Sequence, residues 1–191
     1  TNKSSGKQGY ALAEAALEAG ARVTLISGPT NLPPVPRANM VHVVSAQNMY
    51  DAVMDNIADC DIFISVAAVA DFKPAEQAEQ KIKKVAGKNT LTIELVENPD
   101  IVASVAALEK KPFTVGFAAE TQDLVAYAKR KLANKNLDLI VANDVSDQSI
   151  GFNSDNNATT VIGHDSEVSL ASMSKSALSR KLISMIAEKV A

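Results

Sequence analysis

The chain alternates between short apolar runs and segments with helical periodicity, and this alternation restricts the fold more than any other feature. The runs DIFISVAAVA, FTVGFAAE and LDLIVAND are apolar on both faces, as strands are when helices cover both sides of a parallel sheet. We therefore predict a Rossmann-like three-layer α/β fold with a mostly parallel sheet. The expected helices span residues 7–19, 46–57, 124–136 and 174–190, with another beginning at Pro99, and the expected strands span 21–29, 40–44, 61–70, 91–96, 113–120 and 137–144.

Local signals define several boundaries. Gly20 is placed to end the first helix, and Asn98 is placed to cap the helix that begins at Pro99. Residues 158–163 and 167–172 predict a C-terminal antiparallel hairpin. In GFNSDNN, the residues Asn153, Asp155 and Asn157 predict a turn. We find no internal repeat or linker and expect residues 1–191 to form a single domain.

Composition excludes several classes of protein. The net charge of −3 argues against a nucleic-acid surface, and no apolar run approaches the roughly 18 residues that would span a membrane. A single cysteine, Cys60, rules out a disulfide framework and fits a core position better than a catalytic one, while His42 and His164 lack metal-ligand spacing. We expect a cytoplasmic enzyme or binding domain. Because the chain begins at Thr1 without Met, we also expect it to be part of a longer protein.

The segment SSGKQG, residues 4–9, precedes the first predicted helix and combines hydroxyl residues, glycines and a lysine. Backbone N–H groups in the first turn of a helix bind anions, and glycine lets the backbone approach a phosphate closely. The same residues would also serve as an ordinary helix cap. Neither a Walker motif nor GxGxxG is present, so the segment indicates a phosphate without identifying the molecule that carries it.

In such folds, ligands bind beyond the carboxyl ends of the strands. Asp71 follows a strand, where it would either hold Mg²⁺ through a nucleotide phosphate or cap a turn. Phe117 would either stack on a base or pack in the core. The residues that follow predicted strands are Gly28 and Pro29, Ala67, Ala68 and Asp71, Phe117 to Glu120, and Asn143 and Asp144.

Two groups of lysines are candidates for phosphate contacts. Lys81, Lys83 and Lys84 lie in a loop that would let a flexible cation reach a ligand. Lys131 and Lys135 are four residues apart, which places both on one helix face. Solvated surface lysines are the alternative interpretation in both cases.

The segment from Ala68 to Lys84 is long, lacks a predicted helix and carries apolar Val69, Phe72 and Ile82. Loops of this length in compact domains are usually functional. We predict that part of it packs against a second copy of the chain in a two-fold dimer. The alternative is a lid that closes over the ligand.

Seven motifs occur in a characteristic order, and through them the chain resembles the phosphopantothenate–cysteine ligase domain of bacterial coenzyme A biosynthesis. Two features depart from the family: its first strand would precede Thr1, and Gln8 replaces the usual Met. In bacteria this domain is the C-terminal half of a bifunctional protein whose other half is an FMN-dependent decarboxylase. The motifs are TNKSSGKQG, SVAAVADF, KIKK, ENPDI, GFAAE, KNLDLIVANDV and GFNSDNN.

The resemblance implies a CTP-dependent ligase that joins L-cysteine to 4′-phosphopantothenate through an acyl-cytidylate, with release of pyrophosphate and CMP. It implies that Lys81 is the essential lysine of a mobile loop, that Asn2 holds the acyl intermediate, and that Mg²⁺ acts with CTP near Asp71. Related ligases are dimers. The positions that match CTP or phosphate contacts are Ser4, Ser5, Gly6, Ala67, Asp71, Lys81, Pro99, Asp100, Ile101, Val102, Phe117, Lys131 and Lys135.

Two rival functions come from other classes. A non-catalytic or NAD(P)-dependent nucleotide domain lacks support, because GxGxxG is absent and Gly28-Pro29 stands where an acidic residue would end the second strand. A scaffolding domain for the decarboxylase assembly is the other. Neither rival would release pyrophosphate from CTP.

Overall fold

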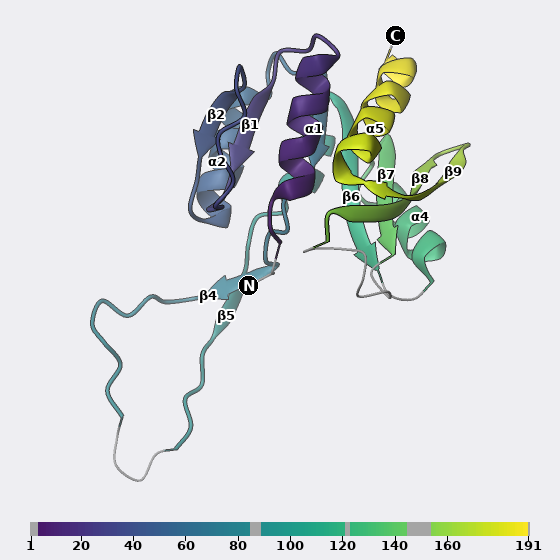
Figure 1. The fold of residues 1–191 in the computed structure, drawn as a ribbon. Helices are drawn as coiled ribbons and strands as arrows, with labels where there is room; N and C mark the ends of the chain where they lie inside the picture. Colours follow the sequence, from purple (N-terminus) through teal and green to yellow (C-terminus); the bar gives the residue numbers. More distant parts are fainter. Residues whose placement is uncertain (1–3, 85–88, 121–122, 145–153, 191) are drawn as a thin grey trace.

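The computed structural model describes residues 4–84, 89–120, 123–144 and 154–190, and it confirms the predicted α/β architecture (Figure 1). The elements are α1 (Lys7–Glu18), β1 (Thr24–Ser27), β2 (Asn39–His42), α2 (Ala46–Asn56), β3 (Ile62–Ser65), β4 (Phe72–Pro74), β5 (Leu95–Glu97), α3 (Ile101–Ala106), β6 (Phe113–Glu120), α4 (Leu124–Asn134), β7 (Leu139–Asp144), β8 (Asn156–Gly163), β9 (Glu167–Ser174) and α5 (Lys175–Val190).

The central sheet has the strand order β3-β6-β7-β8-β9. Strands β3, β6 and β7 are parallel, and β8 and β9 form the predicted antiparallel hairpin. Alternate residues of β7 face opposite layers: Val141 packs with Leu178 of α5, whereas Ala142 packs with Leu132 of α4. Helices α1 and α5 lie side by side on one face of the sheet, and α4 covers the other (Figure 1). The three-layer prediction is therefore correct.

The first helix ends as its sequence predicts. Gly20 has φ = 89°, a left-handed conformation that glycine adopts without a steric penalty. The next residue, Ala21, donates its N–H to the carbonyl oxygen of Ala16 at 3.0 Å, and Gly20 donates to that of Leu17 at 3.1 Å. These two bonds satisfy the last carbonyls of α1.

The prediction for the start of α3 was wrong. The helix begins at Ile101 and its cap is Asp100, whose carboxylate accepts the N–H of Ala103 at 3.0 Å. Asn98 is engaged elsewhere, because its side-chain amide donates to the carbonyl oxygen of Ala70 at 2.9 Å. Pro99 therefore precedes the helix. Asp and Asn are about equally good caps, so local sequence does not distinguish the two positions.

Two other predictions require correction. The strand expected at 91–96 is reduced to β5, because its partner β4 offers only three residues for pairing. The turn predicted at 153–157 does not include Asn157, which lies in β8 with 2% of its surface exposed. Asp155 directly precedes that strand, and Asn153 lies outside the described residues.

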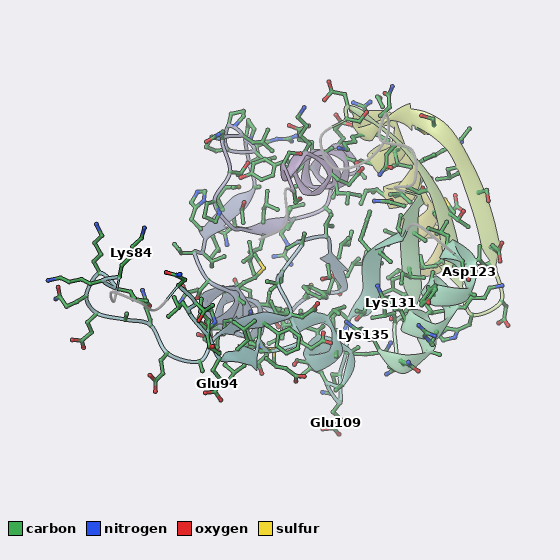
Figure 2. The ribbon with its side chains drawn as sticks, turned by 90° about the horizontal axis from the view of Figure 1, so that it is seen from below. Lys84, Glu94, Glu109, Asp123, Lys131 and Lys135 are labelled. Atoms are coloured by element: carbon green, nitrogen blue, oxygen red, sulfur yellow. The ribbon has the colours of Figure 1, made fainter. Side chains whose placement is uncertain are left out.

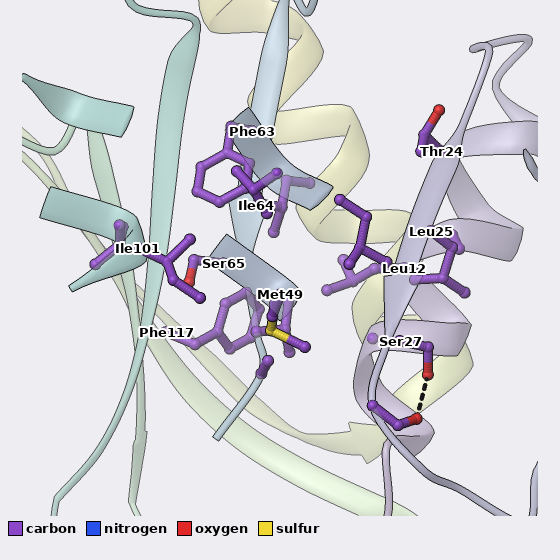
Figure 3. A pocket seen from close by; sticks show the side chains of 18 of the residues that line it. Leu12, Thr24, Leu25, Ser27, Met49, Phe63, Ile64, Ser65, Ile101 and Phe117 are labelled. Carbon is purple, nitrogen blue, oxygen red and sulfur yellow. Dashed lines mark hydrogen bonds between the residues drawn. The ribbon is translucent and has the colours of Figure 1, made fainter. Parts of the chain in front are cut away.

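Strands β1 and β2 form a separate parallel pair, and β1 does not pair with β3. A channel of about 2180 Å³ lies between β1 and β3, and apolar residues of β1, β3 and α1 line it (Figure 3). All four residues of β3 are only partly buried, whereas β7 is buried from Leu139 to Ala142. The apolar strand β3 thus borders an open space where the predicted sheet would be continuous.

Strands β4 and β5 form the base of an arm that projects from the body of the molecule, and its described residues are 72–84 and 89–97 (Figure 1). Phe72, Ile82, Leu91, Ile93, Leu95 and Val96 are exposed along it. They are six of the ten large apolar side chains exposed in the described parts of the chain. No helix forms between Ala68 and Lys84, as predicted.

Candidate functional site

The channel between β1 and β3 reaches the carboxyl ends of the parallel strands, where the site was predicted. Figure 3 shows its wall near Ser27, Ser65 and Phe117. Of the predicted contact residues within the described ranges, all but Lys81 line this one cavity: Ser4, Ser5, Gly6, Ala67, Asp71, Pro99, Asp100, Ile101, Val102, Phe117, Lys131 and Lys135.

The start of α1 forms one end of the site. Gly6, the residue before the helix, has φ = 78°, and a Cβ there would lie 3.4 Å from Thr30 Oγ1. Thr30 Oγ1 also donates to the carbonyl oxygen of Ser5 at 3.3 Å, which holds this turn against the loop after β1. Apart from a long 3.5 Å bond from the Lys7 amide to Ser5 Oγ, α1 has no side-chain cap. Its first-turn N–H groups are therefore arranged for an anion.

The loop after β3 carries Ala67 and Asp71. Asn98 clamps its far end, because its backbone N–H donates to the carbonyl oxygen of Asp71 at 2.8 Å and its side chain donates to that of Ala70. Asp71 itself is exposed. We did not predict this role of Asn98, because Asn98 and Ala70 are 28 positions apart in the sequence and no local signal links them.

Helices α3 and α4 meet at the site through an ion pair. The ammonium of Lys135 lies 3.0 Å from Asp100 Oδ2. Lys135 is the residue that ends α4, one turn after Lys131, and Figure 2 shows the two lysines close together. Phe117 is partly buried against the core cluster that includes Leu12, as the core alternative predicts, and it also lines the cavity, where stacking on a base stays a prediction.

The two predicted catalytic residues have different outcomes. Lys81 is exposed on the arm and does not line the cavity. Lys84, three residues further along the same arm, lies far from Lys131 and Lys135 at the cavity (Figure 2). Asn2 lies outside the described residues.

Sequence reasoning missed a charge cluster beside the start of α1. The Lys7 ammonium lies 2.7 Å from Asp155 Oδ1 and lowers the pKa of that carboxyl. Lys175 is buried, and its ammonium donates to the carbonyl oxygen of Ser154. Burial, with Lys7 nearby, lowers the pKa of Lys175. The three charges come from segments distant in sequence, so no spacing could reveal them.

Cys60 behaves as predicted for a core thiol. Its Sγ donates to the carbonyl oxygen of Ile62 at 3.0 Å, and burial raises its pKa, which disfavours the nucleophilic thiolate. Among the described residues, no group of three or more His, Cys, Asp or Glu side chains could hold a metal ion. No helix within the described ranges combines the length and apolar character needed to cross a bilayer.

The fold is an α/β domain with a cavity that reaches the carboxyl ends of its parallel strands, the place where ligands bind in folds of this class. The family model for the DNA/pantothenate metabolism flavoprotein C-terminal domain matches residues 1–190, and the chain belongs to this family.

Named relatives agree with this assignment. The coenzyme A biosynthesis bifunctional protein CoaBC of Vibrio vulnificus strain YJ016 is 57% identical over 97% of this chain and 47% of its own length. That of Escherichia coli K12 is 49% identical over 97% of this chain and 46% of its own length. The chain therefore spans about half the length of these relatives.

Two solved structures share the fold. The crystal structure of a C-terminal domain of CoaBC superposes with a TM-score of 0.81 at 35% identity, covering 98% of this chain and 84% of that one. A DNA/pantothenate metabolism flavoprotein from Streptococcus pneumoniae has a TM-score of 0.80 at 20% identity, over 97% and 89%. The second likeness concerns the fold alone.

Proposed function

We propose that this chain is a phosphopantothenate–cysteine ligase domain, which uses CTP to join L-cysteine to 4′-phosphopantothenate. The observation that carries the proposal is the convergence of the family-matched residues on one cavity, from the turn at Ser4–Gly6 to Lys131 and Lys135. Membership of the family and the relatives' name in coenzyme A biosynthesis support it.

In the proposed first step, a carboxylate oxygen of 4′-phosphopantothenate attacks the α-phosphorus of CTP. A new P–O bond forms, the bond to the β-phosphate bridge breaks, and pyrophosphate leaves with the electron pair. Negative charge gathers on the phosphates during this step, so cations lower its barrier. Lys131 and Lys135 line the cavity, and Lys81 would supply a further, mobile cation.

In the proposed second step, the cysteine amine attacks the acyl carbon, CMP leaves with the electron pair of the C–O bond, and the amine gives up a proton to solvent. Asn2 is proposed to hold the acyl-cytidylate, because a side-chain amide both donates and accepts hydrogen bonds.

Asp71 fits a nucleotide-bound magnesium ion. Mg²⁺ usually takes one or two carboxylates and completes its shell with phosphates and water, and Asp71 is an exposed carboxylate at the cavity. The ion would neutralise phosphate charge when bound.

We further propose that the longer protein carries an FMN-dependent decarboxylase half and a strand that lies between β1 and β3 and leaves the end of the channel at Ser4 open to the ligand. A strand that precedes α1, runs parallel to β1 and β3 and connects in the right-handed sense would end next to Ser4. The partly exposed apolar side chains of β3 and the gap between the two sheets support this placement.

We also propose a homodimer in which the arm, residues 72–97, packs against the second copy. Its exposed apolar side chains need cover, and Lys81 lies outside the cavity of its own chain. Contact with a partner would place Lys81 near an active site.

Pyrophosphate release tests the proposal. The full-length protein, given CTP, 4′-phosphopantothenate and Mg²⁺, is expected to release pyrophosphate, and addition of L-cysteine is expected to yield the amide and CMP. A folded protein that forms neither pyrophosphate nor the amide would contradict the proposal. In that case a non-catalytic nucleotide domain or a scaffold becomes the better explanation.

A further inference from the structure

Four buried side-chain oxygen atoms lack hydrogen-bond partners at the site end of the sheet: Gln8 Oε1, Asn143 Oδ1, Asn157 Oδ1 and Thr159 Oγ1. Across the described residues only one further side chain, Asn98, has such an atom. Burying an unpaired polar atom destabilises a folded protein. A group of them in one place therefore calls for an explanation other than stability.

Three of the four residues lie on one face of two neighbouring strands, β7 and β8. Asn143 of β7 stands opposite Thr159 of β8 in the strand register, and Asn157 is two residues from Thr159 and so shares its face. Further along the same strands, Val141 and Val161 lie on this face and pack in the core cluster with α1 and α5.

Gln8 lies in the first turn of α1, the helix whose Leu12 packs on this face of the sheet. Gln8 donates from Nε2 to Ser179 Oγ of α5 at 2.8 Å, which joins the two helices above the strands. Gln8 comes two residues after Gly6, so its buried oxygen is close to the proposed phosphate site along the chain. Gln8 is also where this chain departs from the Met usual in the resembled family.

The group opens on the cavity. Gln8, Asn143 and Asn157 line it together with Phe117, although Asn157 is only 2% exposed. Lys175 lines the same cavity with a buried ammonium group. The wall therefore combines side-chain amides with a cation.

The chemistry of these atoms selects the ligand. Amide oxygens accept hydrogen bonds, and neither Asn143 Oδ1 nor Asn157 Oδ1 has a partner among the described residues. A primary amine, such as the α-amino group of an amino acid, supplies N–H donors to these acceptors.

We propose that Asn143 and Asn157 bind the amino group of the amino-acid substrate. This inference rests on the proposed function, which needs such an amine. Two acceptor oxygens hold the two N–H bonds of a neutral amine and leave its lone pair directed at the acyl carbon. The new N–C bond then forms as described above, with CMP as the leaving group.

Two neighbouring asparagines allow a matched test in the full-length protein. Asn157→Ala removes the buried amide, whereas Asn156→Ala removes an exposed one from the adjacent position of β8. The first variant is expected to raise the KM for L-cysteine about tenfold to a hundredfold, as for a lost hydrogen bond to an ionisable group. Pyrophosphate release from CTP and 4′-phosphopantothenate is expected to stay unchanged, and Asn156→Ala is expected to change neither quantity.

A second variant checks that the effect does not come from a folding defect. Thr159→Val removes an unpartnered buried hydroxyl beside Asn157 without touching the proposed amine contacts, so it is expected to leave the KM for L-cysteine unchanged. Thermal melting checks that both Asn157→Ala and Thr159→Val fold. An unchanged KM for cysteine in folded Asn157→Ala, or a raised KM for 4′-phosphopantothenate in its place, would overturn the inference.

Equilibrium binding of L-cysteine alone separates this inference from the proposed function. Wild-type protein and Asn156→Ala are expected to bind it, and Asn157→Ala is expected to bind it at least tenfold more weakly. If wild type releases no pyrophosphate yet shows this pattern, the proposed function fails and the amine site stands. If pyrophosphate is released but cysteine binding and its KM do not respond to the substitution, the amine site fails alone.

Discussion

Asp100 Oδ2 lies 3.0 Å from the Lys135 ammonium, while the Oδ1 atom of the same carboxylate accepts the N–H of Ala103 at 3.0 Å. One side chain thus caps α3 and holds the end of α4 at the edge of the cavity. The Lys135 ammonium therefore forms an ion pair with Asp100 and also lies where it would attract a phosphate bound in the cavity.

Two substitutions at Asp100 separate its roles. Asp100→Ala is expected to lower the free energy of unfolding by about 1 kcal/mol, because the cap is lost. Asp100→Asn retains the cap and is expected to change stability by less than about 0.5 kcal/mol, since exposed ion pairs contribute little. Urea unfolding measures both. Equal destabilisation by the two variants would show that the ion pair, not the cap, is the stabilising interaction.

Lys81→Gln is expected to reduce pyrophosphate release on the order of 100- to 1000-fold without unfolding the protein, because a cation that stabilises developing charge is lost. Lys81 is exposed on the arm, so the fold does not depend on it. Lys84→Gln, an equally exposed neighbour, is the matched control and should retain most activity. Normal pyrophosphate release by folded Lys81→Gln protein would remove Lys81 from the mechanism.

The arm is expected to mediate dimerisation. Replacing Leu91 and Ile93, which are 64% and 60% exposed, with Ser should shift the full-length protein toward the monomer at micromolar concentration. Light scattering measures the mass, and Val168→Ser, a substitution of an exposed apolar residue outside the arm, is the control. A wild-type monomer with full ligase activity would favour the lid over the dimer.

The channel predicts a difference between this 191-residue chain and the longer protein. A strand that covers Ile62 and Ile64 of β3 would bury apolar surface, at roughly 25 cal/mol for each Å² removed from water. The domain is therefore expected to melt at a higher temperature in the longer protein, and the amides of β1 and β3 are expected to exchange their hydrogens more slowly there. Equal melting temperatures and equal exchange in the two forms would contradict a strand in the channel.

The ion pair between Glu18 and Arg180 predicts a pH dependence of stability. Arg180 donates to both oxygens of Glu18, at 2.6 and 3.0 Å, and these bonds lower the pKa of Glu18 below its ordinary value of 4.5. A lowered folded-state pKa stabilises the protein above pH 4.5, and this contribution is lost as the pH falls through the folded value.

Glu18→Gln should therefore lower the free energy of unfolding at neutral pH, and its difference from wild type should shrink below pH 4.5. Urea unfolding at several pH values measures this. Glu109→Gln is the control, because the structure gives Glu109 no ion pair within the described residues. A difference that stays constant from neutral to acidic pH would contradict the ion-pair explanation.

Elements with strong local signals could be predicted from the sequence. The run FTVGFAAE has the same bounds in the structure as in the prediction, Phe113–Glu120, because both faces of this strand are buried and its apolar pattern is continuous. The glycine that ends α1 was equally predictable, since a left-handed residue is needed there. The strand-end rule predicted Ala67, Asp71 and Phe117 at the cavity, whereas Lys131 and Lys135 were assigned only through the family resemblance.

Only the tertiary structure decided which residues meet over long separations in sequence. Asp100 rather than Asn98 caps α3 because Asn98 is bound to Ala70, and Asn157 is buried because β8 pairs with β7. The amides at Gln8, Asn143 and Asn157 converge for the same reason. Local periodicity and capping depend on neighbours within a few residues, so the sequence determined the elements. Partners from distant segments depend on how the elements pack, and only the folded chain brings them together.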